Sequence, residues 1–235
     1  MRLIYVVALT LLAAFPAQAE VKIQEVTSPG GLKAWLVEEH SIPFVALDVR
    51  FRGGASLDAP GKRGAINLMT GLLEEGAGKL DARGFAREAE GLASSFRFGV
   101  DDDSLSVSAR FLTENQDASV ALLKQALQNP RFDQDAIDRV RGQVLSGIRS
   151  SEKDPNDIAR KKMDEMLYGD HPYGSSLDGT VESVTALTRD DLIAAHDAVM
   201  ARDRIYIGAV GDITPEALGK LMDNLLGDLP ATGAQ

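Results

Sequence analysis

The most constraining feature of the sequence is the strict alternation of polar and apolar residues in SLSVSARF, at 104–111. Successive side chains of a strand point to opposite faces, so this pattern predicts an antiparallel strand with one buried and one solvated face. Residues 94–100 precede it across the acidic turn DDD, and we expect the two segments to form a hairpin. Three further strands are expected upstream, at 21–27, 32–38 and 44–51, where SPGG and HSIP separate apolar or alternating runs.

Helical periodicity fills most of the remaining chain. Residues 63–74 follow a glycine-rich loop and carry an apolar stripe made of Ala65, Leu68, Met69, Leu72 and Leu73, which predicts an amphipathic helix. Further helices are expected at 81–91, 115–128, 134–150, 157–167, 180–186 and 189–200, followed by a strand at 204–211 and a closing helix at 214–227. This order predicts an α+β fold in which helices are layered on a mainly antiparallel sheet.

Residue types at the helix starts support these boundaries. Asp81, Thr188 and Thr214 have side-chain oxygens that can accept hydrogen bonds from free amides of a first helical turn. Pro215 occupies the first helical position after Thr214, where the missing amide hydrogen costs nothing. Asp154-Pro155 is expected to separate the helices at 134–150 and 157–167.

The first residues have the layout of a secretory signal peptide. Arg2 is followed by an apolar run and then by Ala-Gln-Ala, which predicts a signal at 1–19 with cleavage after Ala19. A membrane anchor is the alternative, but the apolar run is short for a bilayer span, and no other segment is apolar enough to cross a membrane. We therefore expect a periplasmic protein without membrane insertion after cleavage, with a domain at 20–230 and the start of a linker or tail at 231–235.

Charge and cysteine usage exclude several functions. The net charge is −10, and removal of 1–19 takes away Arg2 and no acidic residue, which leaves −11. A strongly acidic protein repels nucleic acids and anionic membrane surfaces, so neither is an expected partner. The sequence contains no cysteine, which excludes disulfides, zinc–thiolate sites, iron–sulfur clusters and cysteine nucleophiles.

Three short motifs suggest chemistry that their surroundings do not support. Ser150 and Lys153 have the Ser-x-x-Lys spacing of serine–lysine acylases, but the accompanying motifs are missing, and a solvated helix end is the better interpretation. The segment GAGKL resembles a phosphate loop, yet Leu80 stands where Ser or Thr must reach magnesium. The run 101–103 of three aspartates could bind calcium weakly, although calcium loops alternate their ligands and a turn is favoured.

The histidines and one acidic pair are also weak candidates. His40, His171 and His196 are far apart in sequence and form no pair at helical spacing, so each is expected to be a surface or capping residue. His171 carries somewhat more weight because it begins the loop signal HPYG. Glu74 and Glu75 lie at the end of the helix expected at 63–74. Two carboxylates alone favour hard cations and not a catalytic zinc, so we expect them to belong to a solvated face.

Two long segments together resemble the insulinase-like, pitrilysin-type zinc peptidases. GKRGAINLMTGLLEEGAG, at 61–78, is similar to the helix that carries His-x-x-Glu-His in these inverted zincins. The segment at 171–218 contains His-Pro-x-Gly, Gly-Thr-x-Glu-Ser and a strand ending in Gly-Asp, and it looks like the end of the family's first repeat. The opening GGLKAWLVEEHSIPFVALDVRFRGGAS also fits the family. The resemblance spans nearly all of 21–230 and implies one pitrilysin-type repeat, half of a usual two-repeat chain.

The resemblance maps the family's catalytic positions onto residues that lack the required chemistry. The first histidine corresponds to Asn67, the glutamate base to Thr70, the second histidine to Gly71, and a later glutamate ligand to Gly147. Asparagine is a poor zinc ligand, threonine cannot act as the base at neutral pH, and glycine has no side chain. We expect these four positions to be a degenerate motif, with no catalytic residue, no metal and no cofactor in this chain.

Several functions follow from such a scaffold. The first is a non-catalytic subunit that helps bind and enclose peptide substrates for an active family member with an intact His-x-x-Glu-His, which alone would hold zinc. The alternatives are a structural module, a role that family members have in a respiratory complex, and a peptidase whose site uses residues outside this chain. A soluble α+β domain with an unrelated role also stays open. We expect no peptidase activity from the chain alone.

Overall fold

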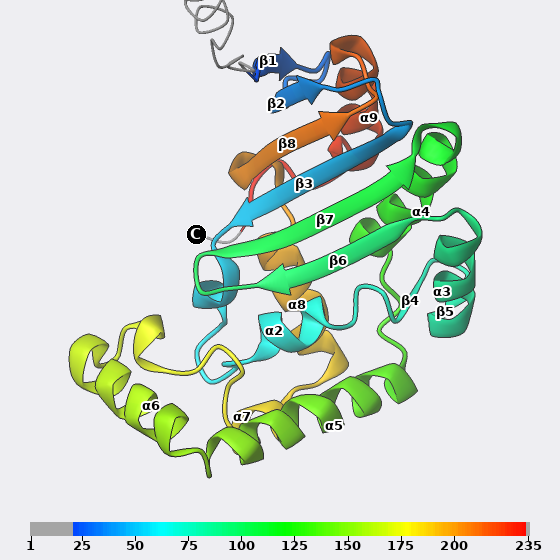
Figure 1. The fold of residues 1–235 in the computed structure, drawn as a ribbon. Coiled ribbons are helices and arrows are strands. Elements are labelled where there is room, and N and C mark those ends of the chain that lie inside the picture. The colour runs from blue at the N-terminus through cyan, green and yellow to red at the C-terminus, as the bar shows by residue number, and fades with distance from the viewer. Residues whose placement is uncertain (1–20, 234–235) are drawn as a thin grey trace, which may run out of the picture.

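The computed structural model describes residues 21–233, which form a six-stranded sheet with helices packed against one face (Figure 1). The signal peptide predicted at 1–19 and the last two residues of the predicted tail lie outside the described residues. No helix within the described part of the chain is both long and apolar enough to cross a membrane.

The sheet mixes one parallel pair with antiparallel pairs. Its strands are β1 (Gln24–Thr27), β2 (Lys33–Glu38), β3 (Phe44–Arg52), β6 (Ser95–Val100), β7 (Ser104–Leu112) and β8 (Ile205–Gly211), in the spatial order β1-β2-β8-β3-β7-β6. The late strand β8 lies between β2 and β3, parallel to β2 and antiparallel to β3. The remaining neighbours are antiparallel, so the predicted mainly antiparallel sheet is confirmed.

The alternation in β7 places its apolar side chains in the core. Leu105, Val107, Ala109 and Phe111 are all buried, and they share the core with the alternate residues of β3. The predicted hairpin joins β6 to β7, with Phe98 opposite Val107. One face of the sheet therefore packs on the helices, as the period-two pattern requires.

The helices agree with most of the predicted boundaries. They are α2 (Ala65–Thr70), α3 (Ala82–Gly91), α4 (Gln116–Gln128), α5 (Gln134–Ser151), α6 (Pro155–Tyr168), α7 (Val181–Ala186), α8 (Arg189–Val199) and α9 (Pro215–Leu226). The side chains of Asp81, Thr188 and Thr214 each accept a hydrogen bond from an amide of the following first turn, which confirms the three predicted caps. Helix α6 begins two residues earlier than expected, because Asp154 caps it and Pro155 occupies its first turn.

The predicted helix at 63–74 is wrong in its extent. Helix α2 ends at Thr70, and Gly71 follows as its C-cap. Beyond it the backbone tightens, since Leu72 N–H donates to the carbonyl of Met69 and Leu73 N–H donates to that of Thr70, three residues back. Leu72 and Leu73 stay buried in these turns, so the apolar stripe reaches the core without a continuous α-helix.

The segment GAGKL forms a small hairpin. Strands β4 (Gly76–Ala77) and β5 (Leu80–Asp81) pair antiparallel directly before α3. Sequence analysis missed this two-stranded element, which is too short to show a period.

Candidate functional site

The entry to α2 is held by a buried carboxylate. Gly64 precedes the helix with φ +96°, a left-handed conformation that favours glycine. The Asp58 carboxylate accepts hydrogen bonds from the N–H groups of Gly64 and Ile66, both at 2.9 Å. Burial raises the pKa of Asp58, while these amides and the nearby Arg63 act in the opposite direction. The carboxylate therefore caps the start of α2 from the loop that precedes the helix.

Arg63 connects three segments around this helix start. Its guanidinium donates to the Asp102 carboxylate at 2.7 Å, to the carbonyls of Pro172 and Ser175 at 3.0 and 2.9 Å, and to the carbonyl of Ala55. One of its nitrogens also lies 3.5 Å from the Asp58 carboxylate, whose side chain is 3% exposed. The loop that begins with HPYG is thereby fixed beside α2.

The structure places Asn67 and Thr70 on α2, Gly71 at its C-cap and Gly147 on α5. Asn67 is half-buried, and its amide nitrogen donates to Asp178 Oδ1 at 2.9 Å. Thr70 is buried, and its hydroxyl donates to the carbonyl of Ile66 at 2.7 Å. The polar groups at these two positions are thus engaged within the protein.

The two glycines lie on exposed surface. A Cβ at Gly71 would meet Val140 Cγ1 of α5 at 3.1 Å, so α2 and α5 lie against each other here, as the resemblance requires. A Cβ at Gly147 would have nothing within 4 Å. Within the described residues, no group of three or more His, Cys, Asp or Glu side chains could hold a metal ion. The residues present at this site therefore do not fit a catalytic zinc.

A cleft of about 700 Å³ adjoins the mapped positions. It lies between the end of α5, helix α6 and the loop at 174–182, and Asp178 is part of its wall. Its lining carries six carboxylates, from Glu152, Asp157, Asp164, Glu165, Asp178 and Glu182, and three cations, from Arg160, Lys161 and Lys162. This surplus of negative charge favours positively charged ligands.

The three aspartates at 101–103 do not point to a common centre. Asp101 accepts hydrogen bonds from the backbone amides of Asp103 and Ser104, which is a turn interaction. Asp102 pairs with Arg63, and Asp103 accepts a hydrogen bond from the Tyr173 hydroxyl, which raises the pKa of Tyr173 to about 12. The turn interpretation therefore explains Asp101, whereas Asp102 and Asp103 contact distant segments of the chain.

The histidines lie at three separate places. His40 is exposed and contacts Asp212 at 2.7 Å, and this hydrogen bond raises the pKa of His40. His171 caps a short 3₁₀ turn at Pro172–Gly174 by accepting from the Tyr173 amide. The His196 side chain is only 12% exposed, so it is not a surface residue; its Nε2 contacts the Leu127 carbonyl in the last turn of α4 at 2.8 Å, which is a capping contact.

The remaining weak candidates lie at the surface or in ion pairs. Ser150 and Lys153 are exposed where α5 ends. Glu74 is exposed, but Glu75 is half-buried and pairs with Arg139 of α5, so the pair is not simply a solvated face. This ion pair adds a second contact between the α2 region and α5.

Sequence analysis missed Asp58, Arg63 and Asp178. For Asp58, the available sequence signal was an aspartate a few residues before a helix that begins after a glycine. Its capping role was hidden because the cap comes from six residues before Gly64 rather than from the residue next to the helix.

The chain belongs to the insulinase family of peptidases, M16. The family model for insulinase (peptidase family M16) matches residues 33–181, more than half of the chain, and the model for the peptidase M16 inactive domain matches 186–235. The resemblance inferred from the sequence is thereby confirmed.

Individual relatives agree with this assignment. The non-peptidase homolog YmxG of Helicobacter pylori is 30% identical over 193 residues, which are 82% of this chain and 45% of the relative. The crystal structure of the peptidase M16 inactive domain from Pseudomonas fluorescens matches with a TM-score of 0.85 at 27% identity, over 91% of this chain and 52% of that one. A protease from Helicobacter pylori shares the fold, with a TM-score of 0.79 at 18% identity over 92% and 52% of the two chains. The chain thus spans about half the length of these relatives.

Proposed function

We propose that this protein is a non-catalytic subunit of a periplasmic zinc-peptidase assembly, in which it helps bind and enclose peptides for an active family member. The observation that carries the proposal is the acidic cleft beside α2, where the positions mapped to zinc chemistry hold Asn67, Thr70, Gly71 and Gly147. A surface of this kind can hold a peptide without cleaving it.

The chemistry of the cleft suggests which peptides it holds. Six carboxylates against three cations favour lysine- or arginine-rich segments, and the volume of about 700 Å³ accommodates several side chains. Holding a peptide in place next to a partner's metal lowers the entropic cost of the reaction that the partner catalyses. The similarity to a protein named a non-peptidase homolog supports the same role.

The metal content of the purified protein tests the degenerate motif. Elemental analysis after dialysis should find no stoichiometric zinc, because Gly71 and Gly147 offer no side chain and the Asn67 amide is bound to Asp178. One tightly bound zinc per chain would show that a ligand set exists elsewhere in the protein.

The subunit role is tested by mixing the mature protein with a genomic neighbour that carries an intact His-x-x-Glu-His. Light scattering should detect a complex at micromolar concentration, and the mixture should cleave basic peptides with a lower KM than the neighbour alone. Absence of a complex together with unchanged activity of the neighbour would refute the proposal and favour the structural role.

A matched pair of variants assigns the effect to the cleft. Glu152→Gln with Asp164→Asn removes two charges from its lining, whereas Glu88→Gln with Glu90→Gln removes two charges from exposed positions on α3. We expect the cleft variant to raise the KM of the mixture for basic peptides and the α3 variant to leave it unchanged. Equal effects of the two variants would show that net charge, and not the cleft, attracts the peptide.

A further inference from the structure

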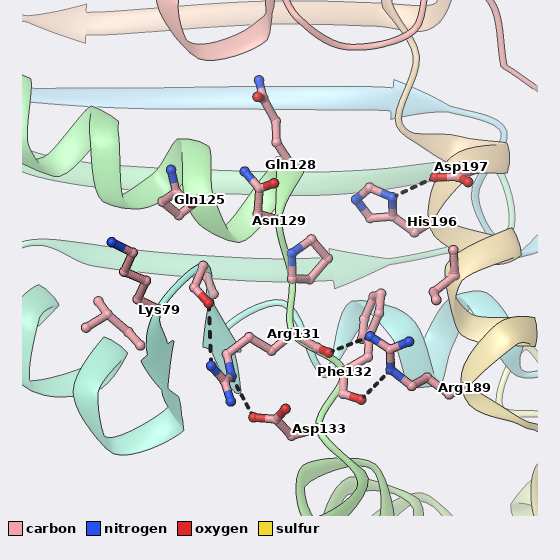
Figure 2. A pocket seen from close by; sticks show the side chains of 15 residues that line it. Lys79, Gln125, Gln128, Asn129, Arg131, Phe132, Asp133, Arg189, His196 and Asp197 are labelled. Carbon is pink, nitrogen blue, oxygen red and sulfur yellow. Dashed lines mark hydrogen bonds and ion pairs between the residues drawn. The ribbon is translucent and has the colours of Figure 1, made fainter.

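We propose that a second groove, formed by the end of α4, helix α8 and the β4–β5 turn, binds an acidic, extended polypeptide segment (Figure 2). The groove has a volume of about 980 Å³ and shares no lining residue with the acidic cleft. The inference goes beyond the proposed function, because the ligand has the opposite charge and the site lies elsewhere on the molecule.

The floor of the groove is a strained turn that other residues hold in place. Phe132 is buried and has φ +48°, a left-handed conformation that is uncommon for a residue with a bulky side chain. Arg189 clamps this turn by donating to the carbonyls of Phe132 and Arg131, both at 3.1 Å. Such strain persists where the surrounding structure enforces it, and it is concentrated at binding sites.

The two walls are also fixed by hydrogen bonds. Gly78 N–H donates to the Asn129 carbonyl at 2.9 Å, and Arg131 N–H donates to the Gly76 carbonyl at 3.1 Å, so the β4–β5 turn is tied to the segment after α4. On the other side, His196 of α8 contacts the Leu127 carbonyl in the last turn of α4. The groove is therefore formed before any ligand arrives, which lowers the entropic cost of binding.

The charges around the groove are not balanced within the protein. Lys79, Arg131 and Arg189 line it, and of these Arg131 pairs with Asp133 at 2.6 Å. Arg189 donates to main-chain carbonyls, and within residues 21–233 neither it nor Lys79 has a carboxylate partner. Asp197 also lines the groove, so its three cations face two carboxylates. This surplus of one positive charge in a protein of net charge −10 creates a local preference for carboxylates.

Two amide side chains supply the groups that recognise a peptide backbone. Gln125 and Asn129 line the groove from the end of α4 (Figure 2), and among the described residues their side chains have no hydrogen-bond partner. Each amide offers both a donor and an acceptor, the pair that a peptide group requires. Free anions would use the cations alone, so the combination favours a polypeptide with acidic side chains.

Fluorescence anisotropy with labelled peptides tests the inference. The probes are a short peptide that alternates glutamate with glycine, its glutamine counterpart and its lysine counterpart. We expect the glutamate peptide to bind the full mature protein about tenfold more tightly than the glutamine peptide. Equal affinity for these two, or competition by inorganic phosphate at equal concentration, would overturn the proposal.

Variants locate the binding. Lys79→Gln should weaken binding of the glutamate peptide about fivefold, and Gln125→Ala with Asn129→Ala should weaken the glutamate and glutamine peptides alike. Lys220→Gln, on exposed surface of α9, is the matched control and should change nothing. Within the described residues, the side chains of Lys79, Gln125 and Asn129 make no hydrogen bond or ion pair, and Lys220 makes only an exposed ion pair. The circular dichroism spectra of the variants should therefore match that of the wild type. Equal affinity of the Lys79 variant and the wild type would refute the site.

Discussion

Replacing Arg63 by alanine should strongly destabilise the fold around α2. The variant removes the cation beside the Asp58 carboxylate, which is 3% exposed, and the donor to the Ala55 carbonyl, which is also buried. Water can replace the contacts to Asp102 and Ser175, because these partners are partly exposed. The main cost is a buried carboxylate without its ion-pair partner, and it amounts to about 3–5 kcal/mol.

Thermal unfolding followed by circular dichroism measures this loss. In a domain of this size each kcal/mol corresponds to about 2–4 °C, so the melting temperature should fall by about 10 °C. Arg63→Lys keeps the charge but loses the planar fork of donors. Its melting temperature should therefore lie between those of the wild type and Arg63→Ala. Arg50→Ala removes an exposed pair with Asp48 at 3.5 Å and should cost less than about 1 kcal/mol. Arg63→Ala and Arg50→Ala losses of equal size would refute the reasoning.

Three further outcomes follow from the structure. In thermal unfolding, Gly64→Ala should destabilise the protein by about 1–3 kcal/mol, because φ is +96° and the new Cβ would lie 2.6 Å from the Asp178 carbonyl oxygen. Gly147→Ala lies on open helix surface and should stabilise the protein by about 0.5–1 kcal/mol. The reverse order of the two stabilities would contradict both assignments. An NMR titration should place the pKa of His40 above its ordinary 6.5, because the Asp212 carboxylate stabilises the charged ring. The stabilisation from this ion pair should be fully present below pH 6.5 and be lost as the pH rises through the raised pKa. A pKa at or below 6.5 would argue against the contact. Expression with the leader should give a mature chain that starts at Glu20, and an intact mass that retains 1–19 would contradict the predicted cleavage.

Local sequence patterns predicted the elements that depend on a few neighbouring residues. The caps at Asp81, Thr188 and Thr214 and the alternation in β7 belong to this group, because each interaction is complete within one turn or one strand. The extent of α2 was mispredicted because the apolar residues keep their helical spacing through the tight turns after Gly71. Periodicity alone therefore cannot distinguish these turns from a continued α-helix.

Features that depend on distant segments could not be predicted in this way. The position of β8 between β2 and β3 is set by pairing across more than 150 residues, and it has no local signature. The left-handed backbone at Phe132 also has no local sequence signature, because it is held by a hydrogen bond from Arg189 of α8. The resemblance to a family predicted where its catalytic positions map, but it carried no information on the groove between α4 and α8.

The side chains of α2 divide between those that pack in the core and those that lie at the surface. Helix α2 buries Ile66, Leu68 and Met69 completely, and these side chains give the helix its place against the sheet. Asn67 is half-buried and Gly71 is exposed, so both lie on the side of the helix that the core does not use. The residues that pack the helix are therefore separate from the two positions that the resemblance maps to histidine ligands. Substitutions at such positions cost little folding free energy, so the packing of α2 does not require a histidine at either one.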